Sequence, residues 1–370
     1  MNVESIRLIN FRNYADAFVE LNENTNIFIG KNAQGKTNLL EAIHICATGK
    51  SFRTSKDREL INFNKSEAYI GAKAKVDNKE KLIEIKYDIK GQKRIKLNKI
   101  ELKSQRELDS GINVVIFSPE DLKIVKGGPI ERRNFIDMSI SQIRPVYKHN
   151  LAKYNKILIQ RNNLLKSGRS LHEIENLLDI FDTQLVNTGT NIIITRLEFV
   201  KKLSDIAFHI HNSLTKSEEK ISIAYNSSVS IKNWDKKAIE KVFIEQIYSN
   251  RQKDLQLGVT SIGPHRDDLN FLLNGKDARI YASQGQQRTI VLTIKLAEVE
   301  ILKMDKGVYP VLLLDDVFSE LDLDRRKYLV KSFSNSQTII TTTELVDLEE
   351  LSNVDKTIFY IENGKIKMKG

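Results

Sequence analysis

The sequence contains very little cysteine and no long apolar run. Cys46 is the single cysteine of the 370 residues, so no disulfide can form within the chain, which fits a reducing compartment. No apolar run approaches the ~20 residues that a helix needs to span a bilayer. The N-terminal stretch MNVESIRLINF also lacks the uninterrupted apolar core of a signal peptide. These absences predict a cytoplasmic protein with no membrane partner, in which Cys46 is a core residue of an apolar helix and not a reactive thiol.

Internal repeats and low-complexity tracts are absent, as are zinc-finger, homeodomain and RNA-recognition signatures. The charge nevertheless favours a polyanionic partner, because 58 lysines and arginines against 48 acidic residues leave a net charge of +10. Residues 144–169 hold seven basic residues and no acid, and residues 86–106 hold eight against two acids. Such runs can follow a phosphate backbone without reading its sequence, or they can form a solvated lysine-rich face.

The chain changes character twice along its length. Its first third contains short β segments, and KLIEIKYDI shows the clearest period-two alternation. The apolar spacing then becomes helical, with one break at KSGRS (166–170), before β signals return. Two long helices joined by a short turn pack antiparallel, so we expect an α/β head interrupted by a helical lobe. The expected parts are an N-terminal part of the head (1–118), the helical insertion lobe (119–250) and a C-terminal part of the head (251–370).

The stretch GKNAQGKT fits the phosphate-loop pattern G-x-x-x-x-G-K-[ST]. A strand-like NIFI precedes it and a helical NLLEAIHI follows it, which is the context that this motif requires. Lys36 is expected to reach the β- and γ-phosphates of ATP, and the Thr37 hydroxyl to bind Mg²⁺. The backbone of the loop wraps the phosphates together with the helix N-terminus. The predicted nucleotide-binding residues are Gly30, Lys31, Asn32, Ala33, Gln34, Gly35, Lys36 and Thr37.

A second motif, VLLLDD, is an apolar strand that ends in two carboxylates, Asp315 and Asp316. Nucleotide hydrolases hold Mg²⁺ in this way. Asp315 is expected to bind the metal directly or through water, and Asp316 to orient or deprotonate the attacking water. An ordinary strand with an acidic turn would show the same letters. The phosphate loop elsewhere in the chain favours the catalytic interpretation.

The stretch GPHRDDL (263–269) gathers His265, Asp267 and Asp268 and could be mistaken for a metal site. Adjacent residues on a turn into a strand cannot all point at one ion without an unusual backbone. A role as a structural turn or at a domain interface is therefore the preferred interpretation.

Five stretches in this order are similar to those of a known family. They are LINFRNY (8–14), SPEDLKIVKGGPIERRNFID (118–137), TSIGPHRDDL (260–269), SQGQQR (283–288) and LLLDDVFSELD (312–322). With the phosphate loop they resemble the RecF family of bacterial recombination mediators over essentially the whole chain. That family belongs with the ABC-type ATPase heads of chromosome-maintenance proteins. The resemblance implies an ABC-type P-loop ATPase head, with a mixed sheet and flanking antiparallel β structure, interrupted by a lobe with a long antiparallel helix pair.

In such heads SQGQQR corresponds to the ABC signature motif. The resemblance implies that Ser283, Gly285 and Gln286 complete the nucleotide site of a second subunit, next to the γ-phosphate that the Lys36 of that subunit holds. A helix N-terminus with a small hydroxyl is a suitable anion site, although Ser283 could also be a plain N-cap. The resemblance further implies that Arg12 reaches the phosphates. The implied catalytic residues are thus Asp316, Lys36 and Ser283.

The chain departs from the wider ABC pattern at three places. No Gln lies within Ser118–Asp121, Thr343 stands where transporters carry a His, and residue 316 is Asp and not Glu. All three departures are consistent with slow hydrolysis. The stretch Ser319–Asp322 matches the loop that crosses the dimer interface in related heads. The insertion is also far shorter than the coiled coils of chromosome-maintenance proteins, which argues against a ring that entraps DNA.

The resemblance implies an ATP-gated DNA clamp that works in recombinational repair, replication-fork recovery and the damage response. The implied cofactors are ATP and Mg²⁺. The implied partners are a second copy of the chain, duplex and gapped or single-stranded DNA, and the proteins RecO and RecR. An ATP-dependent nuclease is the alternative, and it would need a further acidic cluster in a domain of its own. An ABC transporter subunit is disfavoured because no membrane-coupling region is evident.

Overall fold

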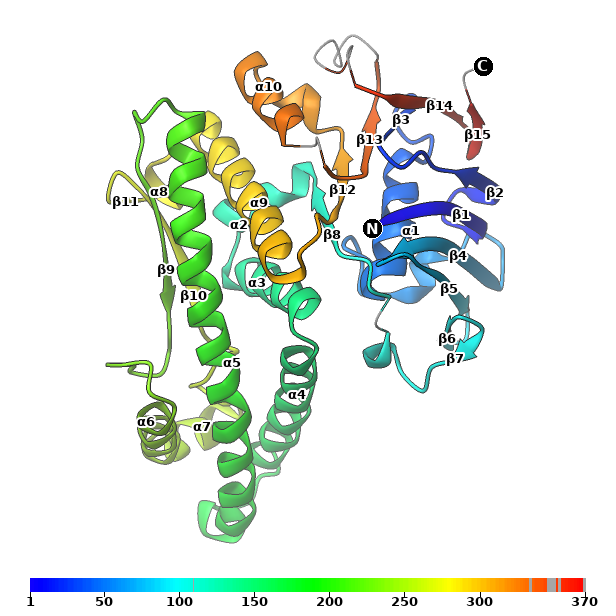
Figure 1. The fold of residues 1–370 in the computed structure, drawn as a ribbon. Helices are drawn as coiled ribbons and strands as arrows, with labels where there is room; N and C mark the ends of the chain where they lie inside the picture. Colours follow the sequence, from blue (N-terminus) through cyan, green and yellow to red (C-terminus); the bar gives the residue numbers. More distant parts are fainter. Residues whose placement is uncertain (109, 333–334, 345–350, 352–353, 369–370) are drawn as a thin grey trace. The chain divides into compact units, whose positions relative to one another are not determined.

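The computed structural model describes residues 1–108, 110–332, 335–344, 351 and 354–368 (Figure 1). Its contacts divide the chain into two compact units. The head unit comprises Met1–Asp121 and Lys295–Gly370, and the helical unit comprises Leu122–Ile294. The first boundary lies close to the expected one. The second lies later than residue 250, because residues 251–294 group with the helical unit and not with the head.

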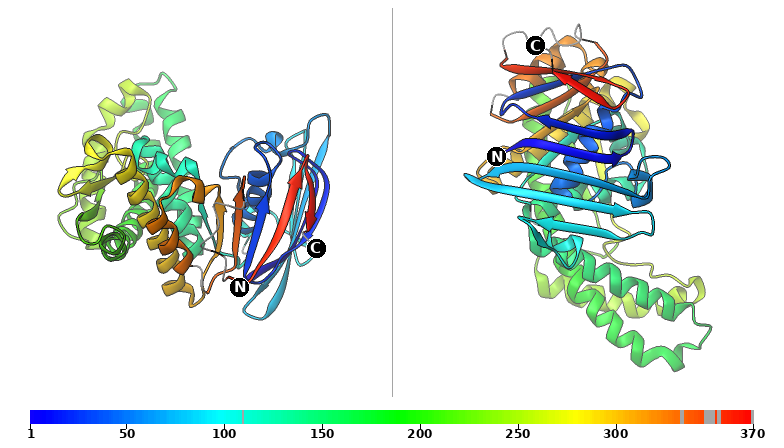
Figure 2. Two further views of the ribbon diagram at one scale, coloured as in Figure 1. Left: turned by 90° about the horizontal axis from the view of Figure 1, so that it is seen from above. Right: turned by 90° about the vertical axis from the view of Figure 1, so that its right-hand side faces the viewer.

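The first sheet of the head unit is antiparallel throughout and follows the order β2-β1-β4-β5-β6-β7. It faces the viewer on the right of Figure 2. Buried and exposed residues largely alternate along its strands, as they do when one face packs on a core and the other meets water. The strands are β1 (Asn2–Phe11), β2 (Tyr14–Glu20), β4 (Glu67–Val76), β5 (Lys79–Asp88), β6 (Lys93–Leu97) and β7 (Ile100–Glu101).

The second sheet of the head unit has the order β15-β14-β3-β13-β12-β8, and all of its pairs are parallel except β14 with β15. Three of its central strands are buried at every position, which is typical of a parallel sheet covered on both faces. The carboxyl ends of its parallel strands therefore meet along one edge. The strands are β3 (Thr25–Ile29), β8 (Val114–Phe117), β12 (Val311–Asp315), β13 (Thr338–Thr342), β14 (Lys356–Glu362) and β15 (Lys365–Met368).

Helix α1 (Lys36–Thr48) contacts strands of both sheets, so one hydrophobic core joins them. The helix is buried on nearly every side, which fits its mostly apolar sequence, and its polar residues Glu41 and His44 are buried as well. Cys46 is buried in this core as predicted, and burial raises the pKa of its thiol to about 12. The other helical segments of the head unit are η1 (Asp57–Leu60), η2 (Gln105–Glu107), η3 (Pro119–Asp121), η4 (Val317–Glu320) and α10 (Leu323–Lys331).

The helical unit is built on the antiparallel pair α4 (Pro145–Leu165) and α5 (Leu171–Leu214), as the apolar spacing predicted. A capping box formed by Ser170 and Glu173 starts α5 after the predicted break. The helix before α4 ends at Ile143, because Pro145 lacks an N–H group and disfavours helical backbone at the residue before it. Although α5 has 44 residues, no helix among the described residues is long and apolar enough to cross a membrane.

The remaining elements of the helical unit surround this pair. A small antiparallel sheet has the order β11-β10-β9. Helix α9 (Gln284–Lys306) starts in the helical unit and ends in the head unit. The other elements are α2 (Leu122–Lys126), α3 (Pro129–Ile143), β9 (Ile221–Asn226), α6 (Lys236–Ser249), α7 (Arg251–Leu257), β10 (Asp268–Leu273), β11 (Lys276–Asp277) and α8 (Ala278–Tyr281).

Candidate nucleotide-binding site

The phosphate loop lies between β3 and α1, at the edge where the parallel strands end. Both of its glycines are required by the packing. A Cβ on Gly30 would lie 2.5 Å from the carbonyl oxygen of Ile361, and Gly35 has a φ of 118° with the side chain of Asn13 2.8 Å from its Cβ position. Ala33 also has a positive φ, and Lys31, Asn32 and Ala33 are exposed at the tip of the loop. The loop is thus wound tightly at its two ends and open between them.

The ammonium group of Lys36 lies inside this loop. Its Nζ donates to the carbonyl oxygens of Gly30 at 2.6 Å and Lys31 at 3.2 Å, and the residue is 5% exposed. A buried cation inside a loop that opens a helix is suited to a phosphate group, because the helix N-terminus adds to its positive potential. The residues therefore fit the polyphosphate that the motif predicts.

The predicted metal ligands meet although they are far apart in sequence. The Thr37 hydroxyl donates to Oδ1 of Asp315 at 2.8 Å, and the Thr341 hydroxyl donates to the same oxygen at 2.9 Å. Burial raises the pKa of Asp315, while these two hydrogen bonds and the charges of Arg53 and Lys36 act in the opposite direction. A divalent cation beside Asp315 would favour its ionised form.

Thr37 and Asp315 fit a magnesium ion that takes its other ligands from phosphates and water. The described residues contain no group of three or more His, Cys, Asp or Glu side chains able to hold a metal by themselves. Mg²⁺ is commonly bound through one or two carboxylates together with substrate phosphates.

Asp316 follows directly after the buried strand β12. Its φ is 55°, a left-handed conformation that non-glycine residues rarely adopt. The Asp316 N–H donates to the Thr341 carbonyl at 3.2 Å, and the Ser319 hydroxyl donates to the Asp316 carbonyl at 2.7 Å. These contacts hold the strained residue where the chain leaves the sheet, which is a common arrangement at functional sites.

Four residues that sequence reasoning did not assign hold either the phosphate loop or Asp315 in place. Asn13 Nδ2 donates to the Gln34 carbonyl at 2.8 Å, and the Tyr14 hydroxyl donates to the Gly35 carbonyl at 2.9 Å. The Asn363 N–H donates to Oε1 of Gln34 at 2.6 Å. The fourth residue is Thr341, which binds Asp315. The stretch LINFRNY signals the first two residues, whereas no sequence motif points to Asn363 or Thr341.

Arg12, which the family resemblance assigns to the nucleotide phosphates, is hydrogen-bonded to other residues of the head unit in this structure. Its Nε and Nη2 donate to the two carboxylate oxygens of the buried Glu41 at 2.9 and 2.7 Å, and its Nη1 donates to the Glu59 carbonyl at 2.7 Å. Arg53 donates to Asn38 at 2.7 Å and lies 3.5 Å from the same Glu41 carboxylate. In this structure Arg12 anchors the β1–β2 turn on α1, so its contact with a phosphate stays a prediction.

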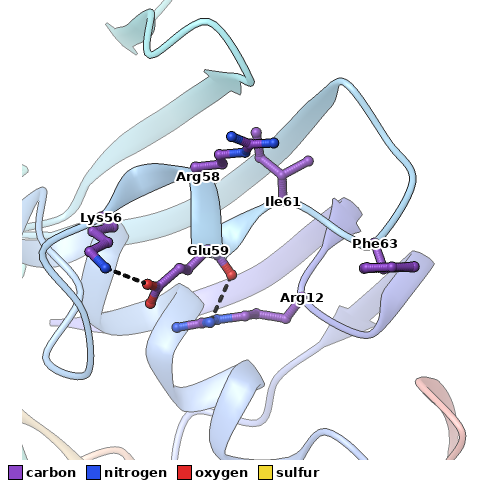
Figure 3. A pocket seen from close by; sticks show the side chains of 6 residues that line it. All are labelled: Arg12, Lys56, Arg58, Glu59, Ile61 and Phe63. Atoms are coloured by element: carbon purple, nitrogen blue, oxygen red, sulfur yellow. Dashed lines mark hydrogen bonds and ion pairs between the residues drawn. The ribbon is translucent and has the colours of Figure 1, made fainter.

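A hollow of about 610 Å³ borders the loop in the head unit. It extends from Asn13 and Asn38, which contact or follow the loop, to Phe63, whose side chain is 87% exposed. Figure 3 shows the adjoining part of this surface, where Arg12 donates to the Glu59 carbonyl and Lys56 pairs with the Glu59 carboxylate. The hollow is lined by Arg12, Asn13, Asn38, Arg53, Glu59, Ile61, Asn62 and Phe63.

The signature stretch lies in the helical unit, at the start of α9. Ser283 and Gln286 form a reciprocal cap, because the Ser283 N–H donates to Gln286 Oε1 at 2.8 Å and the Gln286 N–H donates to the Ser283 hydroxyl at 3.3 Å. The N-cap interpretation of Ser283 therefore holds, and it leaves the residue exposed. Gly285 is exposed too, and a Cβ there would have no heavy atom within 4 Å. Packing within the chain thus gives no reason for glycine at this position.

The GPHRDD stretch organises the helical unit. His265 is hydrogen-bonded to the Tyr154 hydroxyl at 2.7 Å and to the Thr260 carbonyl at 3.0 Å, and burial lowers its pKa to about 4. The Asp267 carboxylate accepts from the backbone and hydroxyl of Ser228. The Asp268 carboxylate accepts two bonds from Arg132 at 2.6 and 3.0 Å. Because each side chain has a different partner, this stretch acts as a structural turn in the structure.

The basic run 144–169 divides into buried and exposed residues. Arg161 is fully buried and binds Asp182 at 2.6 Å and Asp254 at 2.8 Å, and Arg144 pairs with Glu198 at 2.7 Å. Arg161 is therefore part of the core and cannot contact DNA. Lys153 and Lys156 are exposed on α4.

A phosphate loop, a strand-end carboxylate bonded to it and a signature stretch on a long helix define an ABC-type ATPase head. Heads of chromosome-maintenance proteins share this fold. The Smc head bound to the C-winged helix domain of ScpA is 17% identical over the whole of this chain and 97% of its own, with a TM-score of 0.56.

Comparisons over the whole sequence show which family of ABC-type ATPase heads this chain belongs to. The model of the RecF/RecN/SMC N terminal domain matches residues 2–367. The DNA replication and repair protein RecF of Clostridium tetani is 47% identical over 365 residues, which cover 99% of each chain. That of Alkaliphilus oremlandii is 45% identical, with 99% of this chain and 100% of its own covered. The solved recombination mediator protein RecF-ATP in the RecFOR pathway is 39% identical over the whole of this chain and 98% of its own, with a TM-score of 0.92. The chain belongs to the RecF family.

Proposed function

We propose that this protein is an ATP-dependent DNA-binding protein of recombinational repair and replication-fork recovery. ATP and Mg²⁺ bring two heads together on duplex or gapped DNA, and slow hydrolysis releases them. The observation that carries the proposal is the 2.8 Å hydrogen bond between Thr37 and Asp315, which joins the phosphate loop to the acidic strand across 278 residues of sequence. We expect the protein to act in the cytoplasm.

Within the head unit, each part of the site has one task. The phosphate loop and Lys36 bind the triphosphate, and Thr37 and Asp315 hold the Mg²⁺ that neutralises its developing charge. Asp316 orients the attacking water and takes its proton. The hollow between Asn38 and Phe63 is suited to the nucleoside, since an exposed aromatic ring offers a stacking surface for a purine base.

Slow turnover follows from the residues around Asp316. An aspartate is one methylene shorter than the glutamate of most related heads. The stretch Ser118–Asp121 offers no glutamine, and its Asp121 carboxylate instead accepts a hydrogen bond from the Ser118 N–H at 2.7 Å. A long-lived ATP state suits a timed clamp better than a motor, because the protein must remain on DNA until its partners have acted.

Support for pairing of two chains comes from the signature stretch. Ser283 and Gly285 are exposed at a helix N-terminus, where an anion is stabilised, and Gly285 leaves open space beside it. A second chain that presents its phosphate loop to this surface would place a γ-phosphate between the two. ATP would then act as the bridge, which is why we expect pairing with ATP and not with ADP.

Support for DNA binding comes from the exposed face of α4. His149, Lys153, Lys156, Gln160 and Asn163 follow one another at three- or four-residue spacing, so they form one stripe along the helix, and all are exposed. The stripe is ~21 Å long at 1.5 Å per residue. No acidic residue occurs between Asp137 and Glu173. Such a surface can contact several phosphates without reading base sequence.

The pathway rests on the relatives. RecF proteins that are 45–47% identical along their whole length are named for DNA replication and repair, and the solved RecF-ATP structure is placed in the RecFOR pathway. We propose that this protein acts with RecO and RecR to help load recombinase onto gapped DNA.

The test uses the Asp316→Asn variant, which should bind ATP and hydrolyse it poorly. Fluorescence anisotropy of a labelled gapped duplex is measured with ATP and with ADP across a salt series. We expect tight binding with ATP only, and a steep loss of affinity with salt. Equal affinity with both nucleotides would contradict ATP-gated binding, and wild-type turnover in this variant would place the catalytic base elsewhere.

Lysine variants test the α4 stripe in the same assay. Lys153→Gln and Lys156→Gln should each lower the slope of log affinity against log salt by about 1, because each removes one phosphate contact. Lys241→Gln provides the matched control, since this exposed lysine lies on α6 of the same unit and outside the stripe. Equal effects of all three variants would show that overall charge, and not this face of α4, governs binding.

A further inference from the structure

A chain of polar contacts connects the end of α5 to the first turn of α9, within the helical unit. His211 Nε2 lies 3.3 Å from Oε2 of Glu219, and the buried His211 ring is also hydrogen-bonded through Nδ1 to the Thr293 hydroxyl of α9 at 3.0 Å. Oε1 of Glu219 accepts a hydrogen bond from Gln286 Nε2 at 2.8 Å. Gln286 Oε1 in turn accepts the Ser283 N–H. The contacts thus end at the signature stretch.

The chemistry of Glu219 decides how the Gln286 amide is oriented. A glutamine amide has a donor end and an acceptor end of nearly equal shape, and either end could face the protein. An ionised carboxylate only accepts hydrogen bonds, so Glu219 requires the NH₂ end of Gln286 to face it. The oxygen of the same amide must then face the Ser283 N–H.

This orientation has a consequence for the Ser283 hydroxyl. With the side chain of Gln286 held, its backbone N–H donates to the Ser283 oxygen, so that oxygen already accepts one bond. The Ser283 hydroxyl can still donate its own hydrogen, and the residue is exposed. Ser283 is thereby prepared to donate to an anionic oxygen that approaches from outside the chain.

We infer that Glu219 is a positioning residue for the signature motif: it holds Gln286, and through Gln286 the Ser283 hydroxyl, in the geometry that receives the phosphate of a second subunit. The inference rests on the proposed ATP-dependent pairing of two chains. It assigns Glu219, which no sequence motif marks, a part in forming that pair.

Backbone hydrogen bonds and two left-handed residues restrict the conformation of the turn that carries Glu219. Lys216 and Ser217 have φ values of 51° and 67°, in a region that non-glycine residues rarely occupy. The Ser217 N–H donates to the Asn212 carbonyl at 2.8 Å, and the Lys220 N–H donates to Asn274 Oδ1 at 2.8 Å. A turn fixed on both sides of Glu219 delivers its carboxylate to a defined place. The neighbouring Glu218 is exposed.

The experiment compares three substitutions of Glu219 in the full chain that also carries Asp316→Asn, so that ATP persists. Sedimentation with ATP gives the dimerisation constant, and ATP binding to the isolated chain is measured in parallel. Glu219→Ala removes the acceptor and Glu219→Lys replaces it with a donor. Both should weaken dimerisation about tenfold, because the freed Gln286 side chain must be ordered again in each chain of the pair. Glu219→Gln keeps an acceptor oxygen and should stay within about threefold of the parent.

Controls separate positioning from stability. ATP affinity of the single chain should be unchanged in all variants, because the phosphate loop belongs to the head unit. Glu218→Ala, one residue away on the same turn, should dimerise like the parent. In the chain with Asp316 intact, the ATP turnover of Glu219→Ala should return to the parent value at high protein concentration, since pairing and not chemistry is impaired. A thermal melt of each variant shows whether it is folded.

Two results would overturn the inference: Glu219→Ala that dimerises like the parent, or Glu219→Gln that is as impaired as Glu219→Ala while folded. The parent chain serves a different purpose. Failure of the parent itself to dimerise with ATP would contradict the proposed function, whereas a parent that pairs normally together with a normal Glu219→Ala variant contradicts only the role of Glu219.

Discussion

Gly285 offers a prediction in which stability and function move in opposite directions. A Cβ at this position meets no heavy atom within 4 Å, and the residue lies in the first turn of α9 without a positive φ. Gly285→Ala therefore costs nothing within the chain. Because glycine is less favourable than alanine in helices by roughly 0.5–1 kcal/mol, and less so in a first turn, we expect a gain of about 0.5 kcal/mol.

The same methyl group should impair pairing. If the signature stretch receives a phosphate of a second subunit, the added methyl group occupies part of that space. Overpacking of a tight contact costs about 1–3 kcal/mol, which corresponds to a dimerisation constant roughly 5- to 150-fold weaker. ATP binding to the single chain should be unaffected, because Gly285 makes no part of the phosphate loop of its own chain.

Two assays measure the two effects. Calorimetry without nucleotide should show a melting temperature of the helical unit about 1–2 °C higher, given ~2–4 °C per kcal/mol for a domain of this size. Sedimentation with ATP should show the loss of dimer. Gly128→Ala is the control, since Gly128 also has open space around its Cβ position and a φ of −80°. It should leave dimerisation unchanged. A Gly285→Ala chain that is more stable and pairs normally would refute the signature assignment, and a less stable one would refute the steric argument.

Two further predictions concern the head unit. Lys36→Ala should abolish ATP binding measured by titration calorimetry, because it removes the cation inside the phosphate loop. Lys79→Ala, an exposed lysine on β5 of the same unit and outside the loop, should bind ATP like the parent; unchanged affinity in Lys36→Ala would refute the assignment of the loop. Burial lowers the pKa of His44 to about 4, so the folded protein holds this imidazole neutral over a pH range in which the unfolded chain protonates it. The free energy of unfolding is therefore highest above pH 6.5 and falls by up to about 3 kcal/mol as the pH is lowered through 4. His44→Gln should flatten the decline in unfolding free energy between pH 6.5 and 4 in urea titrations, and an unchanged slope would contradict this.

Local patterns in the sequence were sufficient for the elements and for the central motifs. The phosphate loop, the acidic strand end and the antiparallel pair of long helices all lie where their patterns predicted. These features depend on neighbouring residues: a glycine spacing that lets the backbone turn, an apolar run that forms a buried strand, and a three- to four-residue period that forms a helix face. The proline at 145 was also visible in the sequence, but the helical pattern around it concealed the break.

The tertiary structure alone decided which side chains meet. Thr341 binds the same carboxylate as Thr37 because β13 lies between β3 and β12 in the sheet, and strand order is not encoded in any local pattern. Arg161 belongs to an acid-free basic run and is nevertheless buried against two aspartates. Arg12 lies in a family motif, yet its guanidinium holds Glu41. The direction in which a buried charged side chain points depends on the oppositely charged partner that offsets the cost of its desolvation. That partner is brought near only when the whole chain folds.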